Sequence, residues 1–172
     1  MKPTTQTIIK QQLLASLATL KQCVDTCPKE QIHEKHKDYP FSQVVFHALF
    51  YCDFYLSESK ETFFKQDFHI KYKNVFDDYE ELEDRLPTKL YEIAFLNQYV
   101  EHCRGKIEKA LDEITDMELM QNSKMRKNEI VKEELFIDLC RHMQHHAAQL
   151  GLRIQVLTGK ELQWITSGWK EF

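Results

Sequence analysis

The chain has 172 residues, a length that suits one domain with a sizeable apolar core. Charged residues make up 29%, while glycine and proline number only four each, and this composition favours a helical globular protein over a sandwich or a disordered segment. The formal net charge of −4, without a basic stripe, argues against a nucleic-acid binder. No stretch is apolar enough to span a bilayer and the N-terminus lacks a signal-peptide pattern, so we expect a cytoplasmic protein that binds neither nucleic acid nor membrane.

Hydrophobic periodicity predicts an all-α fold with four long helices in a single domain over residues 1–172. The expected helices span about 5–26, 41–56, 88–115 and 128–158. Pro28 follows the end of the first helix, Pro40 precedes the second, and Gly159 is well placed to stop the fourth. The second helix is apolar on more than one face, as a buried helix would be.

Two segments outside these helices are rich in aromatic residues. Residues 59–87, between the second and third helices, form an unusually long connection with many aromatic and acidic side chains. Two readings stay open for it: a structural cover of packed loop or short helices over one end of the core, and a lid or pocket wall. The tail carries Trp164 and Trp169, which are costly to leave in water, so we expect it to fold back on the bundle.

Five cysteines lack the paired spacing of a zinc ribbon or a Cys-x-x-Cys redox site. They are Cys23, Cys27, Cys52, Cys103 and Cys140. Their number is odd, which fits a reducing compartment better than a disulfide framework. We interpret them as buried small residues.

A pair of histidines on the fourth helix is the most informative feature of the chain. His142 and His146 lie four residues apart, so both imidazoles fall on one helical face together with Leu135, Leu139 and Leu150. Polar groups in an apolar stripe need partners, and a bound transition metal provides one. The alternative is a pair of exposed histidines, or of histidines hydrogen-bonded within an ordinary core.

His47 is the best candidate for a third ligand, because it lies in the most apolar helix with Val44, Tyr51 and Phe54 on its own face. A single histidine at such a position is more often a hydrogen-bonded core residue. Three inward histidines from two facing helices favour a metal site in the bundle core, with nickel, zinc, iron or copper as suitable ions. Three nitrogen ligands would leave coordination positions open, as in catalytic sites.

Several neighbours of these histidines have open roles. Asp138, one turn before His142, is interpreted as a partner of a ligand or as a surface carboxylate. We expect Gln149 to hydrogen-bond near the site and Tyr51 to line it, while Asp53 is assigned to a helix interface. His145 lies at the edge of the same face and ranks below His146.

Two segments carry a resemblance to a known family. They read Pro40-Phe-Ser-Gln-Val-Val-Phe-His47, followed by Asp53-Phe-Tyr-Leu56, and His142-Met-Gln-His-His146-Ala-Ala-Gln149-Leu150. Together they resemble the DinB-like family, whose members are four-helix bundles that hold a divalent metal with three histidines. The chain departs from many relatives at Ala147 and Ala148, where these carry Arg-Gly, which puts in doubt what that arginine does.

The resemblance implies an up-down-down-up bundle, a homodimer and His47, His142 and His146 as metal ligands. It also implies a metal-dependent enzyme of the thiol S-transferase or hydrolase type, acting on a small molecule with a low-molecular-weight thiol as cosubstrate. A pocket between the helix ends and residues 59–87 would hold the substrate. Two alternatives stay open: a bundle that binds metal without catalysis, and a protein-interaction module whose histidines are incidental.

Overall fold

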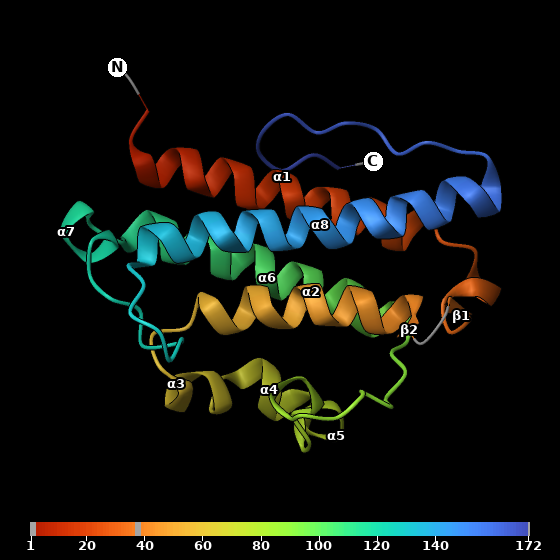
Figure 1. Cartoon of the computed structure of the whole chain (residues 1–172), viewed down its shortest axis with the longest axis horizontal. Coiled ribbons are helices and arrows are strands. Elements are labelled where there is room, and N and C mark those ends of the chain that lie inside the picture. The colour runs from red at the N-terminus through yellow and green to blue at the C-terminus, as the bar shows by residue number, and fades with distance from the viewer. Residues whose placement is uncertain (1–2, 37–38, 172) are drawn as a thin grey trace.

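The computed structural model describes residues 3–36 and 39–171, and these residues are mostly helical (Figure 1). The long helices are α1 (Thr5–Thr26), α2 (Phe41–Tyr55), α6 (Ile93–Glu113) and α8 (Lys132–Thr158). The short helices are α3 (Lys60–Phe64), α4 (Asp67–Lys71), α5 (Lys73–Phe76) and α7 (Asp116–Leu119), with 3₁₀ turns η1 (Lys29–Gln31) and η2 (Glu80–Leu82). Strand β1 (Lys35–His36) pairs with β2 (Tyr39–Pro40) in an antiparallel hairpin. The prediction of an all-α fold with four long helices is confirmed.

The core lies among the four long helices, because α1 and α2 each pack against both α6 and α8 (Figure 1). Each helix contributes fully buried apolar side chains: Leu13, Leu17 and Leu20 on α1, Leu49 and Phe50 on α2, Leu96 and Ile107 on α6, and Leu135 and Leu139 on α8. Removing such side chains from water is the main favourable contribution to folding. Helix α1 has the predicted limits, and α2 ends one residue earlier than predicted.

Helix α6 begins at Ile93, later than the predicted Thr88. The backbone N–H groups of Thr88 and Lys89 donate to the carboxylate of Glu80, each over 3.1 Å. These backbone donors belong to a non-helical stretch before the helix, so the helical pattern in the sequence overstates the length of α6.

Helix α8 also begins later than predicted, at Lys132 instead of Asn128. Val131 forms an isolated bridge with Asn122, so the backbone before α8 pairs with the preceding connection. The predicted stop is confirmed, since Gly159 adopts the left-handed conformation with φ 70° and its N–H bonds to the carbonyl of Gln155.

Residues 59–87 fold into α3, α4, α5 and η2, which lie along the side of α2 (Figure 1). Their aromatic rings enter the core. The ring centroid of Phe76 lies 6.0 Å from that of Phe46 of α2, and the ring of Phe68 stacks on that of Tyr99 of α6 with the centroids 5.1 Å apart. The prediction of packed short helices is confirmed. Their predicted position over one end of the core is wrong, because these rings contact the flanks of α2 and α6.

The C-terminal tail folds back on the bundle, as predicted, and it runs along α1 (Figure 1). Ile165 is buried against Ala15 and Ala18, and Trp169 packs beside them. The expectation that both tryptophans are covered is wrong for Trp164, which is 76% exposed because its neighbour Ile165 takes the inward position.

The interpretation of the cysteines as buried small residues is confirmed for four of the five. All five are unpaired, four are buried, and Cys140 is half-buried. Among the described residues, no helix combines the length and the apolar character that crossing a membrane requires.

Candidate metal centre

The structure brings His47 of α2 together with His142 and His146 of α8. The Nε2 atom of His142 lies 3.1 Å from the Nε2 atom of His47 and 3.1 Å from that of His146. One potential ligand atom from each ring falls within 4.8 Å of the others. The predicted cluster of three histidines therefore exists, across the packed pair of helices α2 and α8.

The cluster lies at the edge of the core. Helix α8 directs Met143 and Ala147 fully inward, and His142 and His146 precede them by one residue, about 100° around the helix. All three histidines are half-buried, and the side chain of His47 is 34% exposed. The expectation of fully inward histidines is wrong in this respect, and the difference leaves the cluster partly exposed to solvent.

Two neighbouring oxygen atoms orient the rings of His47 and His146, which both contact the ring of His142. The carboxylate of Glu81 lies 2.6 Å from Nδ1 of His47, and the amide oxygen of Gln149 lies 2.9 Å from Nδ1 of His146. Oxygen atoms of these kinds accept, so each Nδ1 donates its N–H. In neutral rings this leaves the Nε2 lone pairs of His47 and His146 directed at His142, and carboxylate or carbonyl partners orient metal-binding histidines in the same way.

The ring of His142 is incompletely satisfied. Its Nδ1 atom is buried and has no hydrogen-bond partner among the described residues. Its Nε2 atom faces two lone pairs and can donate to only one of them. Buried polar atoms are nearly always paired in native proteins, so this ring requires an explanation.

Electrostatics keep the two α8 histidines neutral. Burial, and then the neighbouring histidines, lower the pKa of His142 to about 3. Burial, together with His47, lowers the pKa of His146 to about 4. Both rings therefore carry free lone pairs at neutral pH, which is the state that binds a metal.

Glu81 is the site residue that the sequence analysis missed. It comes from η2, in the segment 59–87, and its side chain is only 5% exposed. Tyr51 donates from its hydroxyl to the carbonyl of Glu81 over 3.0 Å, and its ring meets His47 and His142 edge-on. The predicted positions of Tyr51 and Gln149 beside the cluster are confirmed, whereas Glu81 belongs to no recognisable motif and only the acidic character of its segment pointed to it.

Other residues singled out in the sequence lie outside the cluster. Asp138 pairs with Arg126 at 3.2 Å and with Arg141 at 3.7 Å, as a surface carboxylate does. His145 is exposed, with its ring 5.1 Å from that of His146. Burial raises the pKa of Cys140 to about 12, so its thiol is protonated at neutral pH and is a poor ligand.

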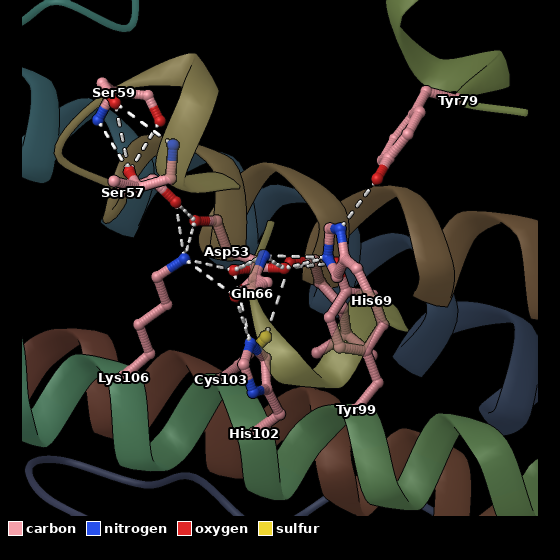
Figure 2. Close-up of polar contacts among 12 residues, drawn as sticks. Asp53, Ser57, Ser59, Gln66, His69, Tyr79, Tyr99, His102, Cys103 and Lys106 are labelled. Carbon is pink, nitrogen blue, oxygen red and sulfur yellow. Dashed lines mark hydrogen bonds and ion pairs between the residues drawn. The ribbon is translucent and has the colours of Figure 1, made fainter. Parts of the chain in front are cut away.

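A second polar cluster surrounds Asp53, further along α2 (Figure 2). Its carboxylate, which is fully buried, is contacted by Gln66, His69, Tyr99, His102 and Lys106. Burial would raise the pKa of Asp53, but hydrogen bonds from His102 and His69 and the charge of Lys106 lower it well below its usual range. The cluster joins α2, α6 and residues 66–69, so Asp53 lies at a helix interface as expected.

A cavity of about 460 Å³ lies where α2, α6 and α8 meet the start of residues 59–87, here called the covering segment. Its wall includes Ser57, Gln66, Lys106, Lys109, Glu113 and Phe136. The cavity occupies the place expected for a substrate pocket, between the helix ends and residues 59–87. None of the three clustered histidines lines it, so the expected link between this pocket and the histidines is not found there.

Comparisons with known proteins inform the fold. No family model matches the chain, and no curated protein matches it in sequence. Among solved structures, the chain is similar to the "Crystal structure of the conserved protein of locus from Enterococcus faecalis", with a TM-score of 0.70 and 15% identity, over 93% of this chain and 100% of that one. At that identity the likeness shows a shared fold alone, and membership of the DinB-like family stays a prediction.

Proposed function

We propose that the chain binds one divalent transition metal, nickel, zinc or iron, through the Nε2 atoms of His47, His142 and His146. The observation that supports this most directly is the direction of the rings, because Glu81 and Gln149 hold two Nδ1 atoms and leave Nε2 lone pairs facing His142. No arrangement of protons on three neutral rings satisfies all three facing nitrogens, whereas one shared cation does.

The donor set favours a reactive metal. Three nitrogen ligands leave coordination positions open, as catalytic sites do. Such a metal supplies a Lewis acid that acidifies bound water or holds a thiolate. The half-buried histidines leave access for a small molecule. We therefore propose a metal-dependent transferase or hydrolase that acts on a small molecule, with a low-molecular-weight thiol as the cosubstrate in the transferase case.

Membership of the DinB-like family is part of the proposal, together with its up-down-down-up helix order and its homodimeric state. The helix order is supported by the path of residues 56–92, which run along the flank of α2 before α6 begins (Figure 1). A connection between parallel neighbouring helices must return along the bundle in this way. The five unpaired cysteines support a reducing, cytoplasmic location.

A metal-binding role without catalysis is a second candidate. It is favoured by the position of the cavity of about 460 Å³, whose wall contains none of the three histidines. Ligand pockets of enzymes commonly have this size and contain the reactive groups. In this alternative the metal stabilises the contact between α2 and α8.

Metal content tests the proposed site directly. Untagged protein, reconstituted with nickel, zinc or iron(II) and dialysed, is compared by elemental analysis with the variants His47→Ala and His146→Ala. His145→Ala is the matched control, because this exposed histidine adjoins His146 and lies outside the cluster. We expect about one equivalent of metal in the parent and in His145→Ala, and none in the other two, with helical content unchanged. A parent without metal contradicts the proposal.

Activity then separates the two candidate functions. Metal-loaded protein is assayed for transfer of small thiols to electrophiles and for hydrolysis of small esters and amides. Turnover that disappears in His146→Ala and persists in His145→Ala supports an enzyme. Stoichiometric metal with no turnover, together with a higher melting temperature of the loaded protein, supports the non-catalytic role.

A further inference from the structure

Two consecutive glutamates in η2 have buried side chains, and these point in different directions. The side chain of Glu80 is buried against residues 88–89, and the carboxylate of Glu81 meets His47 of α2. Successive residues of a 3₁₀ turn are about 120° apart, so one rigid turn presents the two carboxylates to different partners. The position of Glu81 therefore depends on what holds the turn.

Glu80 makes more hydrogen bonds than an ordinary surface carboxylate. It accepts the backbone N–H groups of Thr88 and Lys89 at 3.1 Å each and the hydroxyl of Thr88 at 2.8 Å. Arg85 adds a charged donor at 3.2 Å. Burial would raise the pKa of Glu80, but the hydrogen bonds from Lys89 and Thr88 lower it, so the group is a carboxylate at neutral pH.

The residues on either side of Glu80 are fixed as well. Tyr79 contacts Nδ1 of His69 through its hydroxyl over 3.1 Å, and His69 is bonded to the buried Asp53. The carbonyl of Glu81 accepts the hydroxyl of Tyr51, at 3.0 Å. The turn is thus attached to the bundle at three successive residues, and Glu80 provides the contact that joins it to the chain ahead of α6.

From these contacts, and resting on the proposed metal site, we propose that Glu80 is a positioning residue for the metal centre. Its carboxylate fixes η2 so that Glu81 holds the Nδ1–H of His47 and keeps the Nε2 atom of that ring directed at the metal. The covering segment 59–87 thereby contributes to the site through Glu81, although it supplies no metal ligand itself.

A double-mutant cycle tests this route. Metal affinity is measured by competition with a chromophoric chelator for the parent, Glu80→Gln, Glu81→Ala and the double variant. Changing a partner of a metal-binding histidine typically weakens affinity about 10–100-fold. We expect a drop of that order in Glu81→Ala, about 10-fold in Glu80→Gln, and no further drop when Glu80→Gln is added to Glu81→Ala. If Glu80→Gln lowers the metal affinity by the same factor in the parent and in Glu81→Ala, the proposal is overturned.

Two variants serve as controls. Glu61→Gln changes an exposed glutamate on the same segment, whose ion pair is with Lys65, and should leave the affinity unchanged. Thr88→Val removes one donor to Glu80 with little change in shape and should produce a smaller drop in the same direction. If Glu80→Gln fails to fold, Thr88→Val carries the same cycle with Glu81→Ala. A variant of Glu80 that is less stable but binds metal with parental affinity shows a merely structural role and overturns the proposal.

A readout on metal-free protein separates this proposal from the metal site itself. The Nδ1–H proton of His47, bonded to Glu81, should give a downfield NMR signal that is absent in Glu81→Ala and shifted or broadened in Glu80→Gln. The same signal unchanged in Glu80→Gln contradicts the positioning role whether or not the protein binds metal. A shifted signal in a protein that binds no metal contradicts the proposed function and leaves Glu80 as a residue that orients His47.

Discussion

Helix α2 carries two polar clusters within two turns of each other, and their hydrogen bonding differs. Around Asp53 each neighbouring donor has the carboxylate or Gln66 as its partner, and the group is closed (Figure 2). Around His47 the outer nitrogens are paired, but three inner nitrogens face one another and one atom of His142 has no partner. A closed cluster needs nothing further, whereas the open one has a place for a cation.

The two clusters also differ in charge. Asp53 is an anion held among donors that include Lys106, so its charge is balanced inside the protein. His142 and His146 are neutral at ordinary pH, so each ring offers one nitrogen with a free lone pair instead of a charge. Removing the centre of the first cluster should therefore damage the fold, while removing the centre of the second should damage metal binding. The following predictions test this difference.

The largest expected effect is on stability, from Asp53→Ala. Removing this carboxylate leaves Lys106 and His69 without their buried partner, and breaking a buried ion pair costs about 3–5 kcal/mol. Urea denaturation of metal-free protein measures the free energy of unfolding. Asp138→Ala, which breaks a partly exposed pair, should cost no more than about 1 kcal/mol. Similar values for the two variants would contradict the closed cluster.

The next effect concerns the outer partners of the histidines. Glu81→Ala should weaken metal binding by about 10–100-fold, because the buried carboxylate orients His47 and strengthens its donor nitrogen. Gln149→Ala should weaken it less, since the amide is uncharged and the residue is exposed. Chelator competition gives both constants. A larger loss for Gln149→Ala would mean that the carboxylate is not the dominant partner.

A smaller effect is expected when His142→Phe is made in metal-free protein. The change removes an unpaired buried nitrogen and an unfavourable meeting of lone pairs, so the free energy of unfolding should stay within about 1 kcal/mol of the parent value. The same urea experiment reports it. A loss as large as that of Asp53→Ala would show that the histidines are a closed structural cluster instead.

A separate effect is expected in the pH dependence of stability. The pKa values of His142 and His146 lie at about 3 and about 4 in the folded protein, below the value of roughly 6.5 for an unfolded chain. The unfolded state then binds more protons, so the stability of metal-free protein should fall as pH decreases from about 6.5 to 4. The lowered pKa of Asp53 acts at lower pH, below about 4.

Comparison of metal-free parent with a His142→Phe, His146→Phe double variant isolates this dependence. The double variant should show a shallower slope between pH 6.5 and 4, with a residual slope from His69, whose pKa burial also lowers. Identical slopes in the two proteins would exclude the lowered histidine pKa values. In metal-loaded protein the same interval should release metal, because protons compete for the ligand nitrogens.

The sequence predicted the features that depend on local spacing. The His142 and His146 pair follows from helical periodicity, and His47 was identified because it interrupts an apolar helix. Both predictions depend only on residues that are near one another in the sequence. The same holds for the predictions of the long helices and of the stop at Gly159. Their meeting in space required only that α2 and α8 pack against each other.

The remaining features depend on tertiary contacts that spacing does not contain. Glu81 reaches His47 only because the covering segment runs along α2, and the sequence placed that segment over one end of the core. The role of Asp53 as a hub likewise needs donors from α6 and from residues 66–69. Helices α6 and α8 begin later than predicted because backbone groups just before them pair with partners outside the helices.

The most direct test of the account is a crystal structure of zinc-loaded protein with anomalous diffraction at the zinc absorption edge. We expect one strong peak between the Nε2 atoms of His47, His142 and His146, about 2.0–2.1 Å from each. The Nδ1 atoms of His47 and His146 should keep their bonds to Glu81 and Gln149. No peak at this position under saturating zinc, or a peak at the Asp53 cluster instead, would contradict the account.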